Sequence, residues 1–190
     1  MRKLTYYVAC TVDRFIARED GRFDFFLTEG EHFAHLLSEF PETIPGHLSE
    51  ALGVQSGNKW FDTVLMGRRT YEVGLEIGVT NPYPRLKQYV FSRSMSKSPD
   101  HNVQLITGDS LDIVHKLKQE DGLDIWLCGG AELAATLFPE IDEIILKVNP
   151  VLLGSGIPLF KKIEEPINLD LIDNKVFNNG LMISHYRVGR

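Results

Sequence analysis

The sequence predicts an α/β protein with a largely parallel sheet and a C-terminal antiparallel hairpin. From residue 60 onward, short apolar runs alternate with segments of helical periodicity, which is typical of βαβ units. Two more apolar runs then flank Asn178, Asn179 and Gly180, residue types that tolerate the positive φ of a hairpin turn. The chain has 190 residues and no internal repeat, so a single domain over 1–190 is expected.

The N-terminal third predicts one strand and one helix. Residues 3–10 are rich in aromatic and β-branched types, as strands are. Thr28 and Glu31 have the spacing of a capping box, and the apolar residues behind them recur at helical spacing, so a helix of about three turns is expected. Pro41 ends that helix. Residues 41–58 are rich in proline and glycine and predict an irregular connection with one helical turn.

The remaining two thirds predict the parallel strands, three helices and the hairpin. A helix is expected to open near Thr70, a second to cover 110–119, and a third to run from Ala131 to Phe138 before Pro139. The predicted strands cover residues 62–66, 88–91, 103–106, 125–128, 143–148, 167–176 and 181–188.

Composition excludes several classes of function. The chain carries 20 Lys and Arg against 26 Asp and Glu, a formal net charge of −6, so no nucleic-acid partner is expected. No apolar stretch approaches the roughly 18 residues that span a bilayer, and no signal peptide can be drawn, so no membrane partner is expected. Cys10 and Cys128 lack the spacing of a zinc site, which favours a reducing, cytoplasmic location and no metal.

Two segments combine a strand, glycine and a helix, an arrangement that presents backbone N–H groups to an anion. In the first, Gly67 precedes Arg68, Arg69 and Thr70, where arginine suits phosphate and Thr70 can cap the helix. In the second, Gly129 and Gly130 follow a strand that ends at Cys128. Either segment alone is explained as well by a simple turn, but their joint occurrence predicts a site for a dinucleotide's diphosphate.

A third segment places Ser92 and Arg93 directly after a strand, where they suit an adenosine 2′-phosphate, although a polar turn explains them too. Neither the Gly-x-Gly-x-x-Gly fingerprint nor a Walker A motif occurs, so the nucleotide must be held differently.

Five ordered segments resemble the dihydrofolate-reductase-like family, within it the branch of the reductase domain of the bacterial riboflavin-biosynthesis deaminase-reductase. The resemblance covers nearly the whole chain. It rests on residues 11–17 (TVDRFIA), 65–72 (LMGRRTYE), 91–93 (FSR), 127–133 (LCGGAEL) and the pair 142–144 (DEI) and 150–160 (PVLLGSGIPLF).

The resemblance implies a three-layer fold with a mixed, mostly parallel eight-stranded sheet, and an NADPH molecule lying across the strand ends. It implies that residues 67–70 contact the diphosphate and the 2′-phosphate, and that residues 92–93 contact the adenosine. Ala9, Ile16 and Ala17 would lie near the nicotinamide. The expected cofactor-binding residues are Ala9, Ile16, Ala17, Gly67, Arg68, Arg69, Thr70, Ser92, Arg93, Cys128, Gly129, Gly130, Ala131 and Glu132.

The expected activity is that of a cytoplasmic NADPH-dependent oxidoreductase that transfers hydride to a small planar conjugated acceptor. The folate-type pattern is missing around the first helix, and Cys128 stands where the riboflavin-pathway enzymes often carry Glu. The acceptor is therefore expected to be neither dihydrofolate nor the riboflavin-pathway intermediate. The alternative is an NADP-binding regulatory module that kept the fold without turnover.

The resemblance implies that the turn after the first strand forms the rim of the substrate cleft, so Asp13 is the expected catalytic residue; an Asp that only stabilises its own turn is the equal alternative. Asp24, Phe25 and Phe26 are expected to wall the substrate pocket, although phenylalanine is more often ordinary core. In the resembling proteins the 151–160 region approaches a subunit interface. A homodimer with a small-molecule substrate is therefore expected, with a pocket lid as the alternative role of that region.

Overall fold

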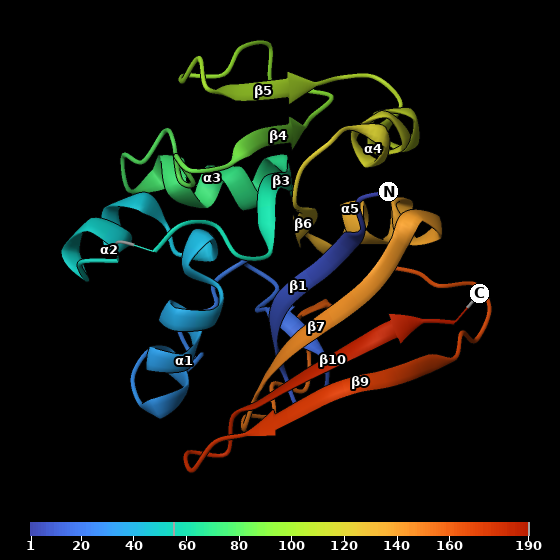
Figure 1. Ribbon diagram of the computed structural model, residues 1–190. Coiled ribbons are helices and arrows are strands. Elements are labelled where there is room, and N and C mark those ends of the chain that lie inside the picture. The colour runs from blue at the N-terminus through green and yellow to red at the C-terminus, as the bar shows by residue number, and fades with distance from the viewer. Residues whose placement is uncertain (55, 190) are drawn as a thin grey trace.

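The computed structural model describes residues 1–54 and 56–189, and an eight-stranded sheet organises them. Its strand order is β5-β4-β3-β6-β1-β7-β10-β9 (Figure 1). The strands are β1 (Leu4–Thr11), β3 (Phe61–Gly67), β4 (Lys87–Phe91), β5 (Val103–Ile106), β6 (Asp124–Gly129), β7 (Ile141–Asn149), β9 (Leu169–Val176) and β10 (Met182–Val188).

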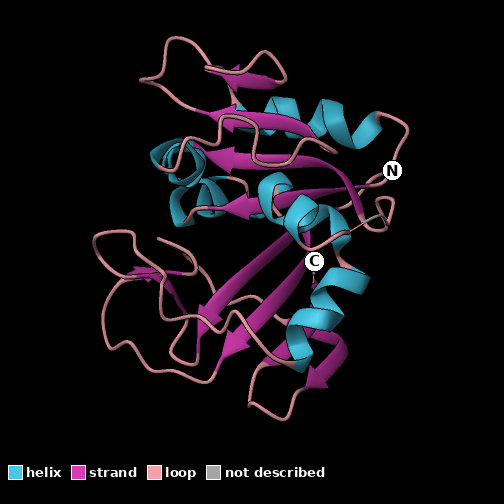
Figure 2. Cartoon of the chain, turned by 90° about the vertical axis from the view of Figure 1, so that its left-hand side faces the viewer, coloured by secondary structure: helices cyan, strands magenta, loops and turns pink. Residues whose placement is uncertain are grey.

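The predicted mixture of parallel and antiparallel pairing is confirmed. The six strands from β5 to β7 pair in parallel, whereas β10 runs antiparallel to both β7 and β9. Figure 2 shows the arrowheads of the parallel strands pointing toward the same side of the molecule, so their carboxyl ends gather there. A ligand site of an open α/β sheet belongs at that edge.

Five α-helices and two short 3₁₀ helices join the strands in the described part of the chain. They are α1 (Glu31–Glu39), η1 (Pro41–Thr43), α2 (Gly46–Ala51), α3 (Arg68–Glu76), α4 (Ser110–Gln119), α5 (Ala131–Thr136) and η2 (Phe138–Glu140). Among residues 1–54 and 56–189, none of the helices combines the length and apolarity that crossing a membrane requires.

Two apolar cores lie on the two faces of the sheet, because neighbouring residues of a strand point to opposite faces. Tyr6 belongs to the core that includes Val114 of α4 and Ala134 of α5. Tyr7 belongs to the core that includes Leu36 of α1 and Tyr71 of α3. The sheet is therefore covered by helices on both faces, which is the predicted layered arrangement.

Three helix boundaries differ from the sequence prediction. The capping box at Thr28 is wrong: Gly30 is the N-cap of α1, no side chain caps it, and Glu31 instead accepts a hydrogen bond from Asn178. Thr70 does not cap α3, which begins at Arg68 behind Gly67. Pro139 lies within η2, after α5 has already ended at Thr136. Tertiary contacts thus override local signals at these termini.

A second, two-stranded sheet was missed by the sequence reading. It pairs β2 (Phe15–Ala17) with β8 (Ile157–Pro158), so the segment after β1 is bound to the segment after β7. Gly156 has a φ of +157°, and a Cβ there would stand 2.3 Å from the Ala17 carbonyl oxygen. Only glycine allows this close approach of the two backbones.

Candidate functional site

The two glycine corners lie against each other at the carboxyl ends of β3 and β6. A Cβ on Gly67 would stand 3.5 Å from both the Gly129 carbonyl oxygen and the Gly130 nitrogen. A Cβ on Gly130 would stand 3.7 Å from the Thr70 hydroxyl oxygen. The corners are separated by about sixty residues in the chain but are adjacent because β3 and β6 pair directly. They form one surface, which we call the glycine corner (Gly67, Gly129 and Gly130).

Backbone N–H groups are available at the glycine corner. The helices α3 and α5 both begin there, with Gly67 and Gly130 as N-caps, and neither N-terminus donates a hydrogen bond to a capping side chain. The peptide bond between Gly129 and Gly130 is cis. Free N–H groups at two adjacent helix N-termini, without side chains over them, suit an anion such as a diphosphate.

A cluster of positive charge borders the glycine corner. The Lys161 ammonium lies 2.5 Å from the Glu132 carboxylate, and its backbone N–H donates to the Ala131 carbonyl oxygen. Lys161 holds the pKa of the Glu132 carboxyl below its usual range, and the charges of Arg69 and Arg93 lower it further. Arg69, Arg93 and Lys161 therefore all act on Glu132, although the chain as a whole is negative. The sequence did not predict Lys161 as a residue of this site.

The other predicted phosphate-binding side chains are engaged within the protein. The Arg68 guanidinium lies 2.7 Å from the Glu72 carboxylate one helical turn away. The buried Ser92 hydroxyl accepts hydrogen bonds from the backbone N–H groups of Ser94 and Met95, at 3.2 and 2.9 Å. Arg93 is exposed beside that turn. The turn therefore positions Arg93, and the Ser92 hydroxyl stabilises this turn by accepting hydrogen bonds from its backbone.

Asp13 is held by a neighbouring segment. Its carboxylate accepts a hydrogen bond from the Thr11 hydroxyl at 2.6 Å and from the backbone N–H of Gly154 at 2.7 Å, and Leu153 N–H donates to it as well. The Thr11 bond is the main cause that lowers the pKa of Asp13. These partners fix the loop that follows β7. The geometry gives Asp13 a positioning role, and a direct role in catalysis stays a prediction.

The segment predicted to wall a substrate pocket lies next to the end of β7. The Phe25 and Phe26 rings contact each other at a centroid distance of 4.6 Å, and both are half-buried. Arg18 stacks on Phe25 and pairs with the exposed Asp24. The backbone N–H of Leu27 donates to Asn149, the last residue of β7. The segment is thus tied to the carboxyl edge of the sheet.

The two cysteines lie on neighbouring strands but on opposite faces of the sheet. Cys10 of β1 belongs to the core under α4 and α5, whereas Cys128 of β6 packs against the core under α1 and α3. Both thiols are free. Burial raises the pKa of Cys128 to about 11, so it is a neutral thiol at pH 7. Its neutral side chain lies directly before the glycine corner.

The remaining predicted contacts lie at the same edge. Ala9 is two residues before the end of β1, while Ile16 and Ala17 lie in β2. Among the described residues, no group of three or more His, Cys, Asp and Glu is placed to hold a metal ion.

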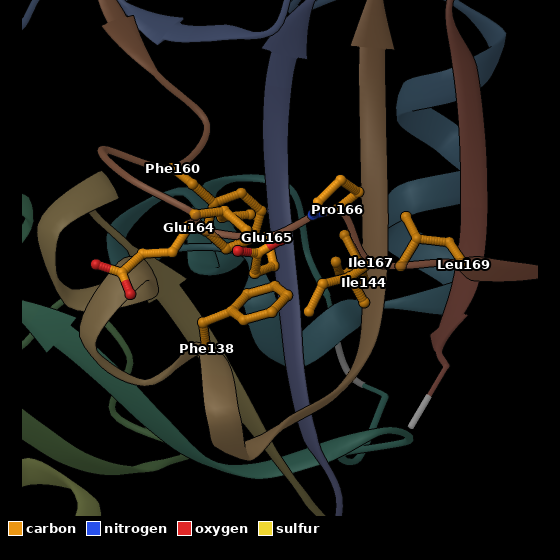
Figure 3. Close-up of a pocket in the computed structure, with 9 residues that line it drawn as sticks. Phe138, Ile144, Phe160, Glu164, Glu165, Pro166, Ile167 and Leu169 are labelled. Carbon is orange, nitrogen blue, oxygen red and sulfur yellow. The ribbon is translucent and has the colours of Figure 1, made fainter.

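An apolar pocket of about 420 Å³ lies away from the glycine corner. It is lined by Phe138, Ile144, Phe160 and the segment from Ile163 to Leu169. Figure 3 shows the two phenylalanine rings on one side of this pocket and Leu169 on the other. It carries no basic side chain, so it does not suit an anionic ligand.

Comparison with known proteins places the chain among reductase-type folds. The family model of the RibD C-terminal domain matches residues 2–183. The uncharacterized protein YwjB of Bacillus subtilis is 35% identical over 98% of both chains. YyaP of the same organism is 29% identical over 95% of this chain and 92% of its own.

Solved structures show the same fold. A protein from Shewanella sp. PV-4, provisionally assigned to riboflavin biosynthesis, has a TM-score of 0.73 and 23% identity, with all of both chains covered. A deaminase/reductase from Thermotoga maritima has a TM-score of 0.64 and 14% identity; the match covers 99% of this chain and 57% of that one. Dihydrofolate reductase from Enterococcus faecalis, solved with NADP(H) and RAB-propyl, has a TM-score of 0.63 and 15% identity over 99% of this chain and 97% of its own.

Proposed function

This chain belongs to the RibD C-terminal domain family, and from that premise and the glycine corner we propose that it is an NADPH-dependent reductase of a small planar conjugated acceptor. The single observation that carries the proposal is the contact between the two corners, at 3.5 Å from the Cβ position of Gly67. NADPH would supply the hydride. The chain's own residues would bind and orient it at the carboxyl edge of the sheet.

The residues present fit the cofactor. The glycine corner would take the diphosphate through the N–H groups of α3 and α5, since no side chain covers them. Arg69 and Arg93 would take the 2′-phosphate, because the guanidinium group matches phosphate oxygens. Ala9 and the β2 strand would border the nicotinamide, where small and apolar side chains leave room for a flat ring.

We propose an acceptor other than dihydrofolate or the riboflavin-pathway intermediate, because the polar groups of α1 are engaged elsewhere. Glu31 binds Asn178, and Glu39 binds the Trp60 indole. The ring of the fully buried His32 binds Asn179, and His35 contacts Lys175. None of these side chains is left free to bind a pteridine. Cys128 also stands where the resembling riboflavin-pathway enzymes often carry Glu.

The test compares the affinities of NADPH and NADH by calorimetry. The native protein should bind NADPH more tightly, and Arg69→Ala and Arg93→Ala should each reduce that preference by about tenfold or more, because a hydrogen bond between charged groups is lost. Arg187→Ala is the matched control, since Arg187 is exposed on β10, where it pairs with Glu143 near the start of β7, at the other edge of the sheet. An unchanged preference in both variants would reject the assigned phosphate contacts.

Turnover separates the enzyme from a silent NADP-binding module. NADPH oxidation is followed at saturating cofactor with pterin, quinone, flavin and aldehyde acceptors. Oxidation with any of them supports the reductase. Tight NADPH binding with no oxidation across the whole panel would favour the regulatory module instead.

A further inference from the structure

Lys147 is a cationic side chain that lies between apolar neighbours on one face of the sheet. It lies on β7, beside Ala9 of β1 and Ile183 of β10, and shares its face with Ile145. Its side chain is partly buried. The ammonium nitrogen lies 4.1 Å from the centre of the Tyr7 ring. A charge in this position requires an explanation, because burial of an ammonium group is costly.

The ammonium of Lys147 has no counter-charge within residues 1–54 and 56–189. No hydrogen bond or ion pair connects it to a carboxylate; it lies over the Tyr7 ring, and the Cys128 thiol packs against the same core. The buried Lys118 of α4, in contrast, contacts the carboxylates of Glu140 and Asp142. Lys147 has no such acceptor among the described residues.

The unpaired ammonium remains accessible to a ligand. It has no hydrogen-bond partner, yet it is not among the buried polar atoms of the described chain that lack one, so it keeps contact with solvent. Burial of the side chain lowers the pKa of Lys147 to about 8, and the two thiols partly oppose this effect. At pH 7 the group is a cation without a hydrogen-bond partner that keeps contact with solvent.

The sheet places Lys147 across from the glycine corner. The strand order is β6-β1-β7, so β1 separates the corner at the end of β6 from Lys147 on β7. Ala9 occupies the middle position and carries only a methyl group. With strands about 4.8 Å apart, roughly 10 Å separates β6 from β7, about the width of a two-ring molecule.

We propose that Lys147 binds a negatively charged oxygen of the acceptor, and that the acceptor is therefore a planar organic anion. This inference rests on the proposed function, because a cofactor at the glycine corner and an acceptor beside it would share the space over Ala9. Lys147 is then the residue that determines specificity. It selects an anion because an anion supplies both an acceptor and the counter-charge that its ammonium group lacks, and such a bond is stronger than one to a neutral oxygen.

Among the described residues, Lys147 is the one positively charged side chain near Ala9 on this face. Burial raises the pKa values of the Cys10 and Cys128 thiols, and it raises that of the Tyr7 hydroxyl strongly. All three are neutral at pH 7. Arg14 contacts Cys10, whose side chain lies in the core on the opposite face. A pH effect on anion binding between pH 7 and 9 is therefore assigned to Lys147.

The experiment uses 2-naphthoate and 2-naphthamide, which have the same planar shape but differ in charge. Both are titrated by calorimetry into protein saturated with NADP⁺, so that phosphate-binding residues are already occupied. Native protein at pH 7 should bind 2-naphthoate at least about tenfold more tightly than 2-naphthamide. This preference should decrease as the pH rises through about 8, where Lys147 loses its proton.

Lys147→Met is the test variant, because methionine keeps most of the length and removes the charge. It should lose the preference for 2-naphthoate while its NADP⁺ affinity is unchanged. Lys116→Met is the matched control, since Lys116 is exposed on α4, and it should keep the preference. Thermal melts followed by circular dichroism show that both variants are folded.

Three results would overturn the assignment of Lys147: equal affinity of native protein for the two probes, no binding of either probe, or an unchanged preference in folded Lys147→Met. Failure of the proposed function gives a different pattern. In that case NADP⁺ and NADPH do not bind, while the naphthoate preference and its dependence on Lys147 persist in protein without nucleotide.

Discussion

A substitution at Gly67 can distinguish what the fold requires from what the proposed function requires. Its φ of −74° is open to any residue, and a Cβ there would meet Gly129 and Gly130 at 3.5 Å, an ordinary contact distance. The backbone therefore does not require glycine at this position. A diphosphate approaching both corners does require it, because the added methyl group would stand between them.

We expect Gly67→Ala to fold with a nearly unchanged melting temperature and to lose about tenfold or more of its NADPH affinity, which is about 1.4 kcal/mol. Calorimetry measures the affinity, and circular dichroism measures the melting temperature. Gly57→Ala is the control, because a Cβ at Gly57 meets nothing within 4 Å. Native NADPH affinity of the Gly67→Ala protein would contradict binding of the diphosphate at this corner.

Side-chain identity at single positions predicted part of the site. Arg93 and the glycines are recognisable from their place after strands. Lys147 carried a weaker signal, a lysine alternating with Ile145 on a strand predicted to be buried, and was missed. Asp13 was recognised as important, but its partners Leu153 and Gly154 could not be foreseen because they lie 140 and 141 residues away.

The strands β1, β7 and β10 are joined by a buried carboxylate. Glu143 of β7 is only 5% exposed; it accepts a hydrogen bond from the Lys3 ammonium at 2.6 Å and pairs with the His185 ring at 2.8 Å. These bonds, that of His185 first, lower the pKa of Glu143 from 4.5 to about 2. A folded-state pKa below the unfolded value means that ionised Glu143 stabilises the fold. This contribution is present above about pH 4.5 and is lost as the pH falls through about 2.

We expect Glu143→Gln to lower the free energy of unfolding by about 1–3 kcal/mol at pH 7, because a buried charged partner is lost. The difference from the native protein should shrink as the pH falls below about 4.5, where the unfolded chain takes up its proton. Urea unfolding at several pH values measures both effects. Glu50→Gln, on the exposed side of α2, is the control. A pH-independent difference would contradict the assigned role.

Element positions were predicted better than element ends. The periodicities that predicted β3, β6 and α4 depend on burial of one face, and burial is what the tertiary structure requires of them. Their ends depend on particular partners. Asp109 caps α4 by accepting a hydrogen bond from the Leu111 N–H at 2.8 Å. Glu31, which was predicted to complete a capping box, instead accepts a hydrogen bond from Asn178 of the hairpin. The two-residue strand β8 is too short to carry any periodicity.

At the scale of the whole molecule, the exposed apolar residues raise the question of a homodimer, which stays a prediction. Leu152, in the segment expected to approach a partner, is 72% exposed. The edge strand β9 is exposed throughout, and Leu171 and Val176 there are about 60% exposed. Unpaired apolar edges of this kind are usually covered by another chain.

We expect light scattering after size exclusion to give twice the chain mass of 21.5 kDa. Leu152→Lys should shift the protein toward the single-chain mass, because it would bury a charge in the interface. Leu171→Lys is the companion variant. A native protein with the mass of one chain at all concentrations would contradict the homodimer. Dissociation by Leu171→Lys but not by Leu152→Lys would place the interface at β9.

The sequence by itself determined the α/β class, the parallel strands with their closing hairpin and the two glycine segments, because these depend on local periodicity and on the conformations that glycine and asparagine allow. Only the tertiary structure decided that Gly67 meets Gly130, that Lys161 joins Arg69 and Arg93, and that Lys147 faces Ala9 without a counter-charge. Such contacts join distant segments, and their geometry is fixed by strand order and register. Neither quantity is encoded in any short stretch of the chain.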